Sequence, residues 1–303
     1  MANDKQYDAI IVGGSYAGLS AAMTLGRSMR NVLVIDSGKP CNRFTPHAHN
    51  FITHDGTTPA EIAAEAKRQV LLYDTVMFVE DLALTGHLCD DGSFEITTEK
   101  GGHYQAKKLL FATGITDILP AIEGIEACWG KSVLHCPYCH GYEVRNKQIA
   151  ILSNGDVGYE TCKHLSNWSS DVTLFTNGKS TLSQEQFLKL KEHNIAVVEN
   201  EIASVEHEAG YMKNIIFNDG TQQPVDAMFT IAAFSQHCPI PEQLGCKLDE
   251  HGRIDTDEMR TTSVPGVYAA GDNSGMFRAL AGAIAAGCTA GAAINRALIS
   301  NSF

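Results

Sequence analysis

Near its start, the chain has a glycine-rich turn that limits the folds open to it. An apolar run at residues 9–12 precedes this turn, which extends from Gly13 to Gly18. Apolar residues then recur at helical spacing, and a second apolar run, residues 31–35, ends at Asp36. A strand, a helix and a second strand joined in this order form a right-handed crossover, which requires a parallel sheet. The N-terminal part of the chain is therefore predicted to be an α/β domain.

The same pattern recurs in the middle of the chain. Residues 148–152 are predicted to form a strand, 156–167 a helix and 171–175 a second strand. A further helix at 183–193 and a strand at 195–199 extend the pattern. Two copies of one nucleotide-binding architecture predict an α/β fold with two Rossmann-like domains of three layers each.

The first glycine turn has the composition of a dinucleotide-binding loop. Its candidate binding residues are Gly13, Gly14, Ser15, Ala17 and Gly18. Glycine permits a tight turn and lets the backbone approach a pyrophosphate, while the following helix offers free N–H groups. Asp36, about 20 residues further on, is positioned to accept hydrogen bonds from an adenosine ribose. The loop alone does not distinguish FAD from NAD.

A Cys-x-x-Cys pair, Cys136 and Cys139, precedes the second copy of the pattern. This spacing allows the two sulfurs to form a reducible disulfide. A zinc site would need two more ligands, and the chain has no second Cys-x-x-Cys and no His-x-x-x-His. The run also matches the haem c attachment pattern, but that attachment occurs outside the cytosol. A redox disulfide is therefore the favoured interpretation, no metal is assigned, and an inert loop is the remaining alternative.

A histidine, His140, directly follows the second cysteine. Thiol–disulfide exchange needs a proton donor and acceptor, and an imidazole with an ordinary pKa of about 6.5 can serve as either. The predicted catalytic residues are therefore Cys136, Cys139 and His140. The simpler alternative for His140 is a solvated loop histidine. His47 and His49, which lie in a loop, are given no chemistry.

The charge and the cysteine content exclude several classes of protein. The chain carries 23 basic and 35 acidic residues, a formal net charge of −12, which argues against binding nucleic acid. No secretory signal is recognisable, and no apolar run is expected to approach the roughly 20 residues needed to cross a membrane. Nine cysteines with one close pair do not form a disulfide framework. We therefore expect a cytoplasmic protein that contacts neither nucleic acid nor a membrane.

In their order along the chain, the glycine turn, the cysteine pair and the late Gly271-Asp272 resemble one known family. The family is the low-molecular-weight thioredoxin reductases, a group of flavoprotein disulfide oxidoreductases, and the resemblance covers nearly the whole chain. It implies FAD as cofactor and a homodimer. It also implies a discontinuous FAD domain, residues 1–116 and 246–303, around a central NAD(P)-like domain, residues 117–245, that carries the cysteine pair.

The resemblance implies further contacts and roles. The additional cofactor-binding residues predicted from it are Ser37, Arg43, Asn50, Ala112, Thr113, Gly114, Gly271, Asp272, Arg278 and Ala279. Asp272 looks like the carboxylate that holds the ribityl chain, and Arg278-Ala279 replaces the usual Arg-Gln, which alters one flavin contact. Cys139 corresponds to the sulfur next to the flavin and Cys136 to the exchanging sulfur. His140 stands where the family usually has Asp.

A narrower branch of the group shows closer similarity. The run from Asp36 to Gly38, together with Arg43 and the run from Cys136 to Glu143, is similar to the fungal dithiol oxidases, which form disulfides in epidithio natural products. Members of that branch pass electrons from a dithiol through the cysteine pair and FAD to oxygen. Other atypical relatives reduce thioredoxin. The expected partner is a thioredoxin-like protein or a small-molecule dithiol or disulfide, and the direction of electron flow stays open.

The central domain departs from the family pattern where NADPH should bind. The run from Ser153 to Gly158 lacks the first glycine of the usual G-x-G-x-x-A motif, and the run from Thr176 to Ser180 has one Lys in place of a basic cluster. A single Lys is a poorer phosphate ligand than a bidentate Arg. We therefore predict an FAD-dependent disulfide oxidoreductase with a degenerate NADPH site. An ordinary NADPH-dependent thioredoxin reductase and a flavin-based redox sensor are the alternatives.

Overall fold

The computed structural model describes residues 6–303. The prediction that no secretory signal is present depends in part on residues 1–5, which lie outside the described residues. Internal contacts divide the chain into two compact units. Unit 1 consists of the residues up to Arg43, with Ala60–Thr116 and Phe234–Phe303. Unit 2 consists of Phe44–Pro59 and Asp117–Ala233.

Unit 1 is built on a mixed sheet of seven strands. The strands are β1 (Tyr7–Val12), β2 (Val32–Asp36), β3 (Val76–Glu80), β4 (Ala83–Leu88), β5 (Phe94–Thr98), β6 (His103–Phe111) and β17 (Val267–Ala269). Their order is β3-β2-β1-β6-β5-β4, and β17 pairs with the last residues of β6. Pairing is parallel from β3 to β6 and antiparallel between β6, β5 and β4. The continuous apolar runs of β1 and β2 are buried, as strands covered on both faces should be.

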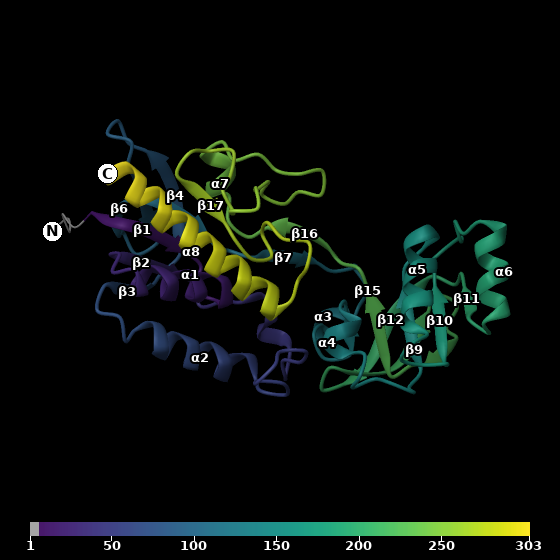
Figure 1. The fold of residues 1–303 in the computed structure, drawn as a ribbon. Coiled ribbons are helices and arrows are strands. Elements are labelled where there is room, and N and C mark those ends of the chain that lie inside the picture. The colour runs from purple at the N-terminus through teal and green to yellow at the C-terminus, as the bar shows by residue number, and fades with distance from the viewer. Residues whose placement is uncertain (1–5) are drawn as a thin grey trace. The chain divides into compact units, whose positions relative to one another are not determined.

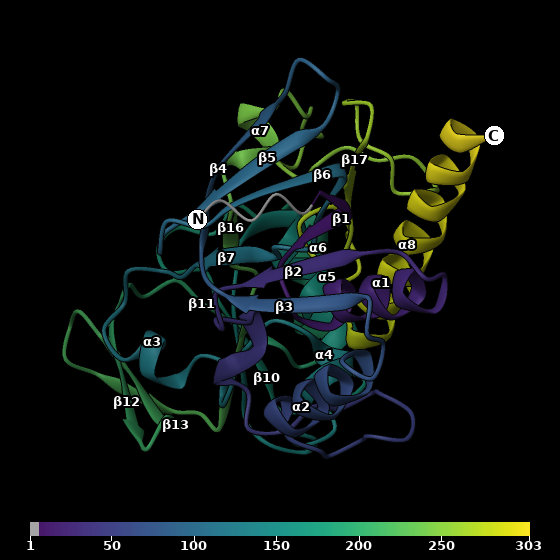
Figure 2. The ribbon, with the colours of Figure 1, turned by 90° about the vertical axis from the view of Figure 1, so that its left-hand side faces the viewer.

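Three helices cover one face of this sheet. They are α1 (Tyr16–Arg27), α2 (Pro59–Val70) and α8 (Leu280–Ser302). Their apolar sides share a core with Ile11 and Val34 of the sheet. Figures 1 and 2 both show α8, in yellow, lying along α1, in purple. The approach is close, because a Cβ atom at Gly287 would overlap with the backbone oxygen of Ala17.

The composition of α8 corrects one expectation. The helix has 23 residues and contains an 18-residue stretch with a mean hydropathy of 1.2, so it is long and apolar enough to cross a membrane by length and composition. The expectation that no apolar run approaches that length was therefore wrong. Packing accounts for the small and apolar residues on one side of the helix, because Gly287, Ala290, Gly291, Ile294 and Leu298 are buried and this side lies against α1. The buried share of the apolar stretch is 39%.

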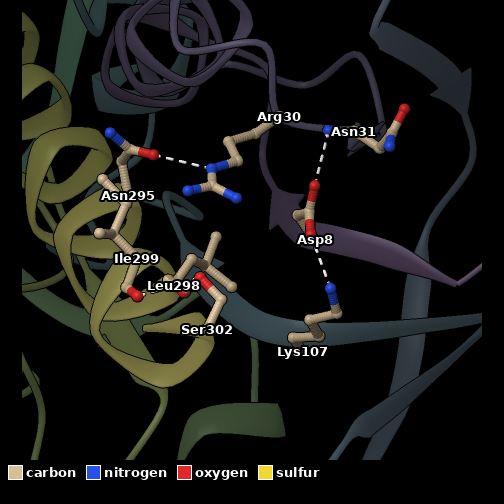
Figure 3. A network of polar contacts seen from close by, with 8 residues as sticks. All are labelled: Asp8, Arg30, Asn31, Lys107, Asn295, Leu298, Ile299 and Ser302. Atoms are coloured by element: carbon tan, nitrogen blue, oxygen red, sulfur yellow. Dashed lines mark hydrogen bonds and ion pairs between the residues drawn. The ribbon is translucent and has the colours of Figure 1, made fainter.

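Polar contacts around the start of β1 join strands of the sheet to each other and to helix α8 (Figure 3). One carboxylate oxygen of Asp8 accepts from the backbone N–H of Asn31, 3.0 Å away, and the other from Lys107 Nζ, also at 3.0 Å. Arg30 Nε donates to Asn295 Oδ1 at 2.7 Å. The start of β1, the turn before β2, strand β6 and helix α8 are thereby tied together.

Unit 2 contains a second, smaller Rossmann-like layer system. Its parallel sheet has the order β11-β10-β9-β15-β8. The strands are β8 (Val133–Leu134), β9 (Ile149–Leu152), β10 (Val172–Phe175), β11 (Ala196–Val198) and β15 (Ala227–Thr230). The helices are α3 (Ile125–Cys128), α4 (Pro137–His140), α5 (Gly155–Leu165) and α6 (Gln184–Glu192). The predicted α/β class with two Rossmann-like domains is confirmed.

Other elements were not predicted from the sequence. In unit 2, β12 (Ile202–Glu208), β13 (Tyr211–Phe217) and β14 (Gln222–Pro224) form an antiparallel sheet. The strands β7 (Ile115–Ile118) and β16 (Ala233–Gln236) pair where the chain passes from one unit to the other. The short helices η1 (Cys41–Phe44) and α7 (Ile240–Gln243) complete the fold.

The boundaries of the two compact units differ from the predicted domain boundaries in two segments. Residues 234–245 were placed in the central domain, but Ile240 lies in the core of unit 1, and a Cβ atom at Gly86 of β4 would come within 2.6 Å of it. Residues 44–59 were placed in the FAD domain, but they cluster with unit 2. In that unit, Phe44 lies so close to Gly130 that a Cβ atom there would be 3.1 Å from it.

Candidate active site

The glycine turn of unit 1 adopts a conformation that larger residues could not. Gly13 has a φ of +104°, and a Cβ atom on it would overlap with the backbone oxygen of Ala112. A Cβ atom on Gly18 would overlap with the oxygen of Gly13. Ser15 is the N-cap of α1, but its side chain makes no capping hydrogen bond. The first N–H groups of α1 are therefore left without a side-chain cap, as a phosphate-binding helix requires.

The predicted ribose ligand, Asp36, lies beside this turn. Its Oδ1 accepts from the backbone N–H of Gly14 at 2.8 Å, and its Oδ2 accepts from that of Gly38 at 3.2 Å. These bonds fix the carboxylate at the end of β2. The side chain is partly exposed, so it retains acceptor capacity for a ribose hydroxyl.

The ends of β6 and β17 form the other side of the cradle in unit 1. Gly271 has a φ of +96°, and a Cβ atom on it would lie 3.2 Å from Ala17 Cβ, so the loop that carries Asp272 meets the start of α1. Asn273 is fully buried and donates through Nδ2 to the oxygen of Phe111 at 2.8 Å. Arg278 Nε donates to Asp272 Oδ2 at 3.4 Å.

Two buried polar atoms in this loop have no partner among the described residues. They are Asn273 Oδ1 and Ser274 Oγ. A buried polar atom without a hydrogen bond is unfavourable, and a bound ligand is one way to satisfy it. With the uncapped start of α1, these atoms make the cradle fit the phosphates and ribityl chain of an FAD.

The remaining predicted cofactor contacts are placed as follows. The turn of Ala112, Thr113 and Gly114 follows β6 and borders Gly13. Ser37 is partly buried next to Asp36, while Arg43 is exposed and donates to the oxygen of Pro40 at 3.0 Å. Ala279 is the N-cap of α8. Asn50 belongs to unit 2, so unit 1 does not bring it together with the other predicted contacts.

The cysteine pair lies in unit 2, at the start of α4. The structure joins Cys136 and Cys139 through their sulfurs, with the Cα atoms 5.3 Å apart. Pro137 occupies the first turn, and the backbone N–H of His140 donates to the oxygen of Cys136 at 3.2 Å. The other seven cysteines are free thiols. The turn therefore presents two bonded sulfurs and the histidine side chain in one local structure.

His140 is held in a neutral state by its surroundings. Burial lowers its pKa to about 4, and the charge of His49 adds to this effect. Near neutral pH the imidazole is therefore unprotonated and able to accept a proton from a thiol. His135, on the other side of the pair, stacks on Trp129 with ring centroids 5.7 Å apart.

An aromatic cluster supports the turn. The ring of Tyr138 packs edge-on against Trp168 at 5.7 Å and against His164 at 5.3 Å. The Tyr138 hydroxyl and His164 Nε2 are within hydrogen-bond distance at 3.2 Å. These contacts anchor the Cys-x-x-Cys turn to the end of α5, and no local sequence signal predicted them.

A pocket of about 470 Å³ opens beside the turn within unit 2. Its lining residues are His135, Pro137, Ser153, Asp156, Val157, Glu160, Thr161, His164, Phe229, Thr230 and Ile231. The pocket lies at the carboxyl ends of β9 and β15 and at the start of α5, which is where Rossmann folds bind nucleotides. Two of its lining side chains, Asp156 and Glu160, are acidic.

The loops that should hold a nucleotide are tied to each other instead. Asn154 Oδ1 accepts from the backbone N–H groups of Gly155 at 2.8 Å and Thr181 at 2.9 Å. Asn154 Nδ2 donates to the oxygen of Lys179 at 3.0 Å. The loop after β10 is thus bonded directly to the start of α5.

Two Rossmann-like units, one with a flavin cradle and one with a bonded Cys-x-x-Cys turn, define a flavoprotein disulfide oxidoreductase. The family model described as pyridine nucleotide-disulphide oxidoreductase matches residues 7–287. The chain belongs to this family, and FAD is its cofactor.

Individual relatives agree with the family. The chain is similar to a protein named thioredoxin reductase tcpT from Claviceps purpurea, with 30% identity over 99% of this chain and 97% of the relative. It is also similar to the crystal structure of a putative thioredoxin reductase from Bacillus anthracis, with 32% identity, a TM-score of 0.94, and coverage of 98% and 100%. An oxidoreductase from Agrobacterium tumefaciens shares 35% identity with a TM-score of 0.92, over 98% and 99%.

Proposed function

We propose that this protein transfers electrons between FAD and a dithiol or disulfide partner through the Cys136–Cys139 pair. The observation that carries the proposal is the bonded pair in one turn with a neutral, proton-accepting His140. Bound FAD supplies a two-electron acceptor and donor. The partner is a thioredoxin-like protein or a small-molecule dithiol or disulfide.

The residues of unit 2 can carry the exchange steps. A partner thiol gives its proton to His140, and the resulting thiolate attacks Cys136 Sγ, so the Cys136–Cys139 bond breaks and Cys139 leaves as a thiolate. The second partner thiolate then attacks the partner sulfur of the mixed disulfide and releases Cys136. Two electrons have passed to the cysteine pair, and the partner has become a disulfide. The reverse sequence reduces a partner disulfide.

We also propose that the pocket of unit 2 does not serve NADPH in the usual way. Asp156 in the first turn of α5 and Glu160 one turn later line the pocket, where their charge would repel a pyrophosphate. Asn154 already bonds the two loops that would hold the nucleotide, and the segment after β10 offers Lys179 as its one cation.

Anaerobic titration tests this proposal. NADPH and NADH are added separately to the oxidised protein while the flavin absorbance is followed. We expect neither nucleotide to bleach the flavin stoichiometrically at micromolar concentration, because each lost ~1.4 kcal/mol of binding weakens affinity about tenfold. Stoichiometric bleaching by NADPH within seconds would show an ordinary NADPH-dependent reductase.

A cytoplasmic location and a homodimeric state belong to the same proposal. The first is supported by nine cysteines with a single close pair, and the second by the resemblance to thioredoxin reductases. Light scattering on the purified protein tests the dimer, and a monomeric mass at micromolar concentration would contradict the proposed homodimeric state.

A further inference from the structure

One wall of the pocket beside α5 is formed by the Cys-x-x-Cys turn. Two lining residues, His135 and Pro137, flank Cys136 in the sequence, and Cys136 is partly exposed. A third lining residue, His164, packs on Tyr138 of the same turn, with ring centroids 5.3 Å apart. All the lining residues belong to unit 2. A molecule that reacts with Cys136 can therefore place its other atoms in this pocket.

The other walls of the pocket are largely apolar. Phe229, at the end of β15, is 2% exposed, whereas Ile231 and Val157 are 63% and 53% exposed. Large apolar side chains around a hollow are typical of small-molecule sites, and a volume of about 470 Å³ lies within the usual range of such sites. The hydroxyl groups that line the pocket, which can orient a ligand, belong to Ser153, Thr161 and Thr230.

The fixed charges of the pocket are negative. Asp156 and Glu160 line it, and no Lys or Arg stands among its lining residues in the described part of the chain. Asp156 Oδ1 accepts from the neutral Gln186 Nε2 at 2.7 Å, which leaves its charge in place. Glu160 Oε2 lies 3.4 Å from Lys163 Nζ, but both side chains are mostly exposed, so water weakens this pair. Two carboxylates at one hollow attract cations and repel anions.

These features favour a small molecule over a protein as the occupant. A protein partner is recognised over about 800 Å² of its surface, whereas a small molecule is bound by burying most of its surface in one pocket. Thiol exchange requires a sulfur of the partner to be held next to Cys136. A pocket whose wall is the Cys-x-x-Cys turn can hold that sulfur by binding the body of the molecule.

We propose that this pocket binds the body of a small-molecule disulfide or dithiol that is uncharged or cationic, and that Asp156 and Glu160 disfavour anionic ones. The inference rests on the proposed exchange at Cys136–Cys139 and names the class of its partner. In the step that the pocket serves, the Cys136 thiolate attacks one sulfur of a partner disulfide. The partner's S–S bond breaks, a mixed disulfide forms, and the other half leaves as a thiolate, so no outside oxidant or reductant is needed.

The test measures this single step in a Cys139→Ser protein, where no second cysteine of the turn can release the mixed disulfide. The probes are hydroxybenzyl disulfide, β-mercaptoethanol disulfide, cystamine and dithiodipropionate, which are aromatic, small and neutral, cationic and anionic. The labelled Cys136 peptide is counted by mass spectrometry. Each rate is divided by that of the same probe with free dithiothreitol, which cancels the probe's own reactivity.

The normalised rates should follow the chemistry of the pocket. Cystamine should react about tenfold faster than dithiodipropionate at low salt, the lower end of the effect of a charged cleft on association, and added salt should reduce this ratio. Hydroxybenzyl disulfide should react about tenfold faster than β-mercaptoethanol disulfide, and its rate should level off as the pocket fills. Neither readout depends on FAD content.

Matched variants assign these preferences to the pocket. Glu160→Gln should narrow the ratio between cystamine and dithiodipropionate. Glu192→Gln should leave the ratio unchanged, because Glu192 forms the same i, i+3 pair with a lysine but does not line the pocket. Ile231→Ala should reduce the preference for hydroxybenzyl disulfide, whereas Leu188→Ala, an exposed apolar residue on α6, should not. Should Ile231→Ala fold poorly, Val157→Ala removes part of the same apolar wall.

Two outcomes would overturn the assignment. One is a set of equal normalised rates for all four probes, and the other is a preference that the pocket variants leave unchanged. Failure of the proposed function looks different, because Cys136 would then form a mixed disulfide with none of the probes.

Discussion

At the scale of single residues, burial decides which thiols and imidazoles can react. Burial raises the pKa of Cys162 to about 12 and that of Cys238 to about 11, so these thiols stay protonated near neutral pH and are inert. Burial acts on the charged form of His140 and lowers its pKa to about 4. Burial thus keeps the thiols of the core cysteines protonated and unreactive, and it also keeps His140, next to the Cys136–Cys139 pair, neutral.

Replacing that base should slow exchange. His140→Ala is expected to reduce the rate of mixed-disulfide formation by roughly 10²–10⁴-fold, the usual effect of a lost general base. His140→Asp, which restores the residue that the wider family uses, should retain more activity than His140→Ala. FAD content, measured by absorbance after denaturation, should be unchanged in both. An Ala variant with the wild-type rate would remove His140 from the mechanism.

The lowered pKa of His140 also predicts a dependence of stability on pH. Between pH 6.5 and about 4 the unfolded state binds more protons than the folded state, so the free energy of unfolding falls as the pH falls through this window. The loss is at most about 3.5 kcal/mol, for a shift of about 2.5 pKa units at ~1.4 kcal/mol each, and partial exposure of the side chain reduces it. Urea unfolding at several pH values should show a shallower dependence in His140→Gln. An identical dependence in both proteins would contradict the burial argument.

Asp36 carries a prediction about cofactor retention. Asp36→Ala removes hydrogen-bond acceptors for a ribose and a support for the backbone of Gly14, and each charged hydrogen bond contributes ~1.5–3 kcal/mol. FAD should therefore dissociate more readily, by at least tenfold in Kd, as measured by flavin fluorescence on dilution. Asp81→Ala, at a buried aspartate whose backbone N–H donates to the oxygen of Asp36 at 3.0 Å, serves as a control for loss of stability next to the site. Equal FAD affinity in Asp36→Ala and wild type would remove the ribose role.

At the scale of elements, the sequence predicted what depends on local periodicity. The β1–turn–α1–β2 unit and its copy from β9 to β10 were found at their predicted positions, because apolar spacing and glycine placement are local signals. The antiparallel strands β12 to β14 were missed, since register shifts break the alternation in the β12–β13 pair. The packing of α8 on α1 could not be predicted either, because it depends on contacts such as that between Gly287 and Ala17.

That contact gives a prediction at this scale. Gly287→Ala would place a Cβ atom on the backbone of Ala17, so α8 must move away from α1, which should lower the free energy of unfolding by about 1–3 kcal/mol. FAD retention should fall as well, because Ala17 belongs to the turn that is predicted to bind the phosphates of FAD. Cys288→Ala, on the exposed side of α8, is the matched control. Thermal unfolding and FAD content measure both effects, and a Gly287→Ala protein equal to the control would contradict the close approach.

At the scale of the whole molecule, the chemistry is divided between the two units. Unit 1 contains the cradle of Gly13, Asp36 and Asp272, and unit 2 contains the cysteine pair and His140. The residues of both sites could be singled out from the sequence because each set belongs to a local motif and to a family resemblance. The membership of residues 44–59 in unit 2 could not be predicted, because it depends on tertiary contacts between distant segments. The position of His49, which lies in this segment, could therefore not be predicted either. The sequence placed a degenerate nucleotide site at the run from Ser153 to Gly158, but the residues that complete the pocket beside α5 could not be predicted, because distant segments supply them.

The central claim, that electrons pass between a thiol partner and FAD through Cys136 and Cys139, is tested most directly by anaerobic reduction with dithiothreitol. The flavin absorbance is followed in the wild type, in Cys136→Ser and in Cys139→Ser, all loaded with FAD. We predict that the wild-type flavin is bleached and that neither variant reaches more than a small fraction of its rate, since each lacks one sulfur of the exchanging bond. Bleaching of both variants at the wild-type rate would contradict the account and make the disulfide a structural feature.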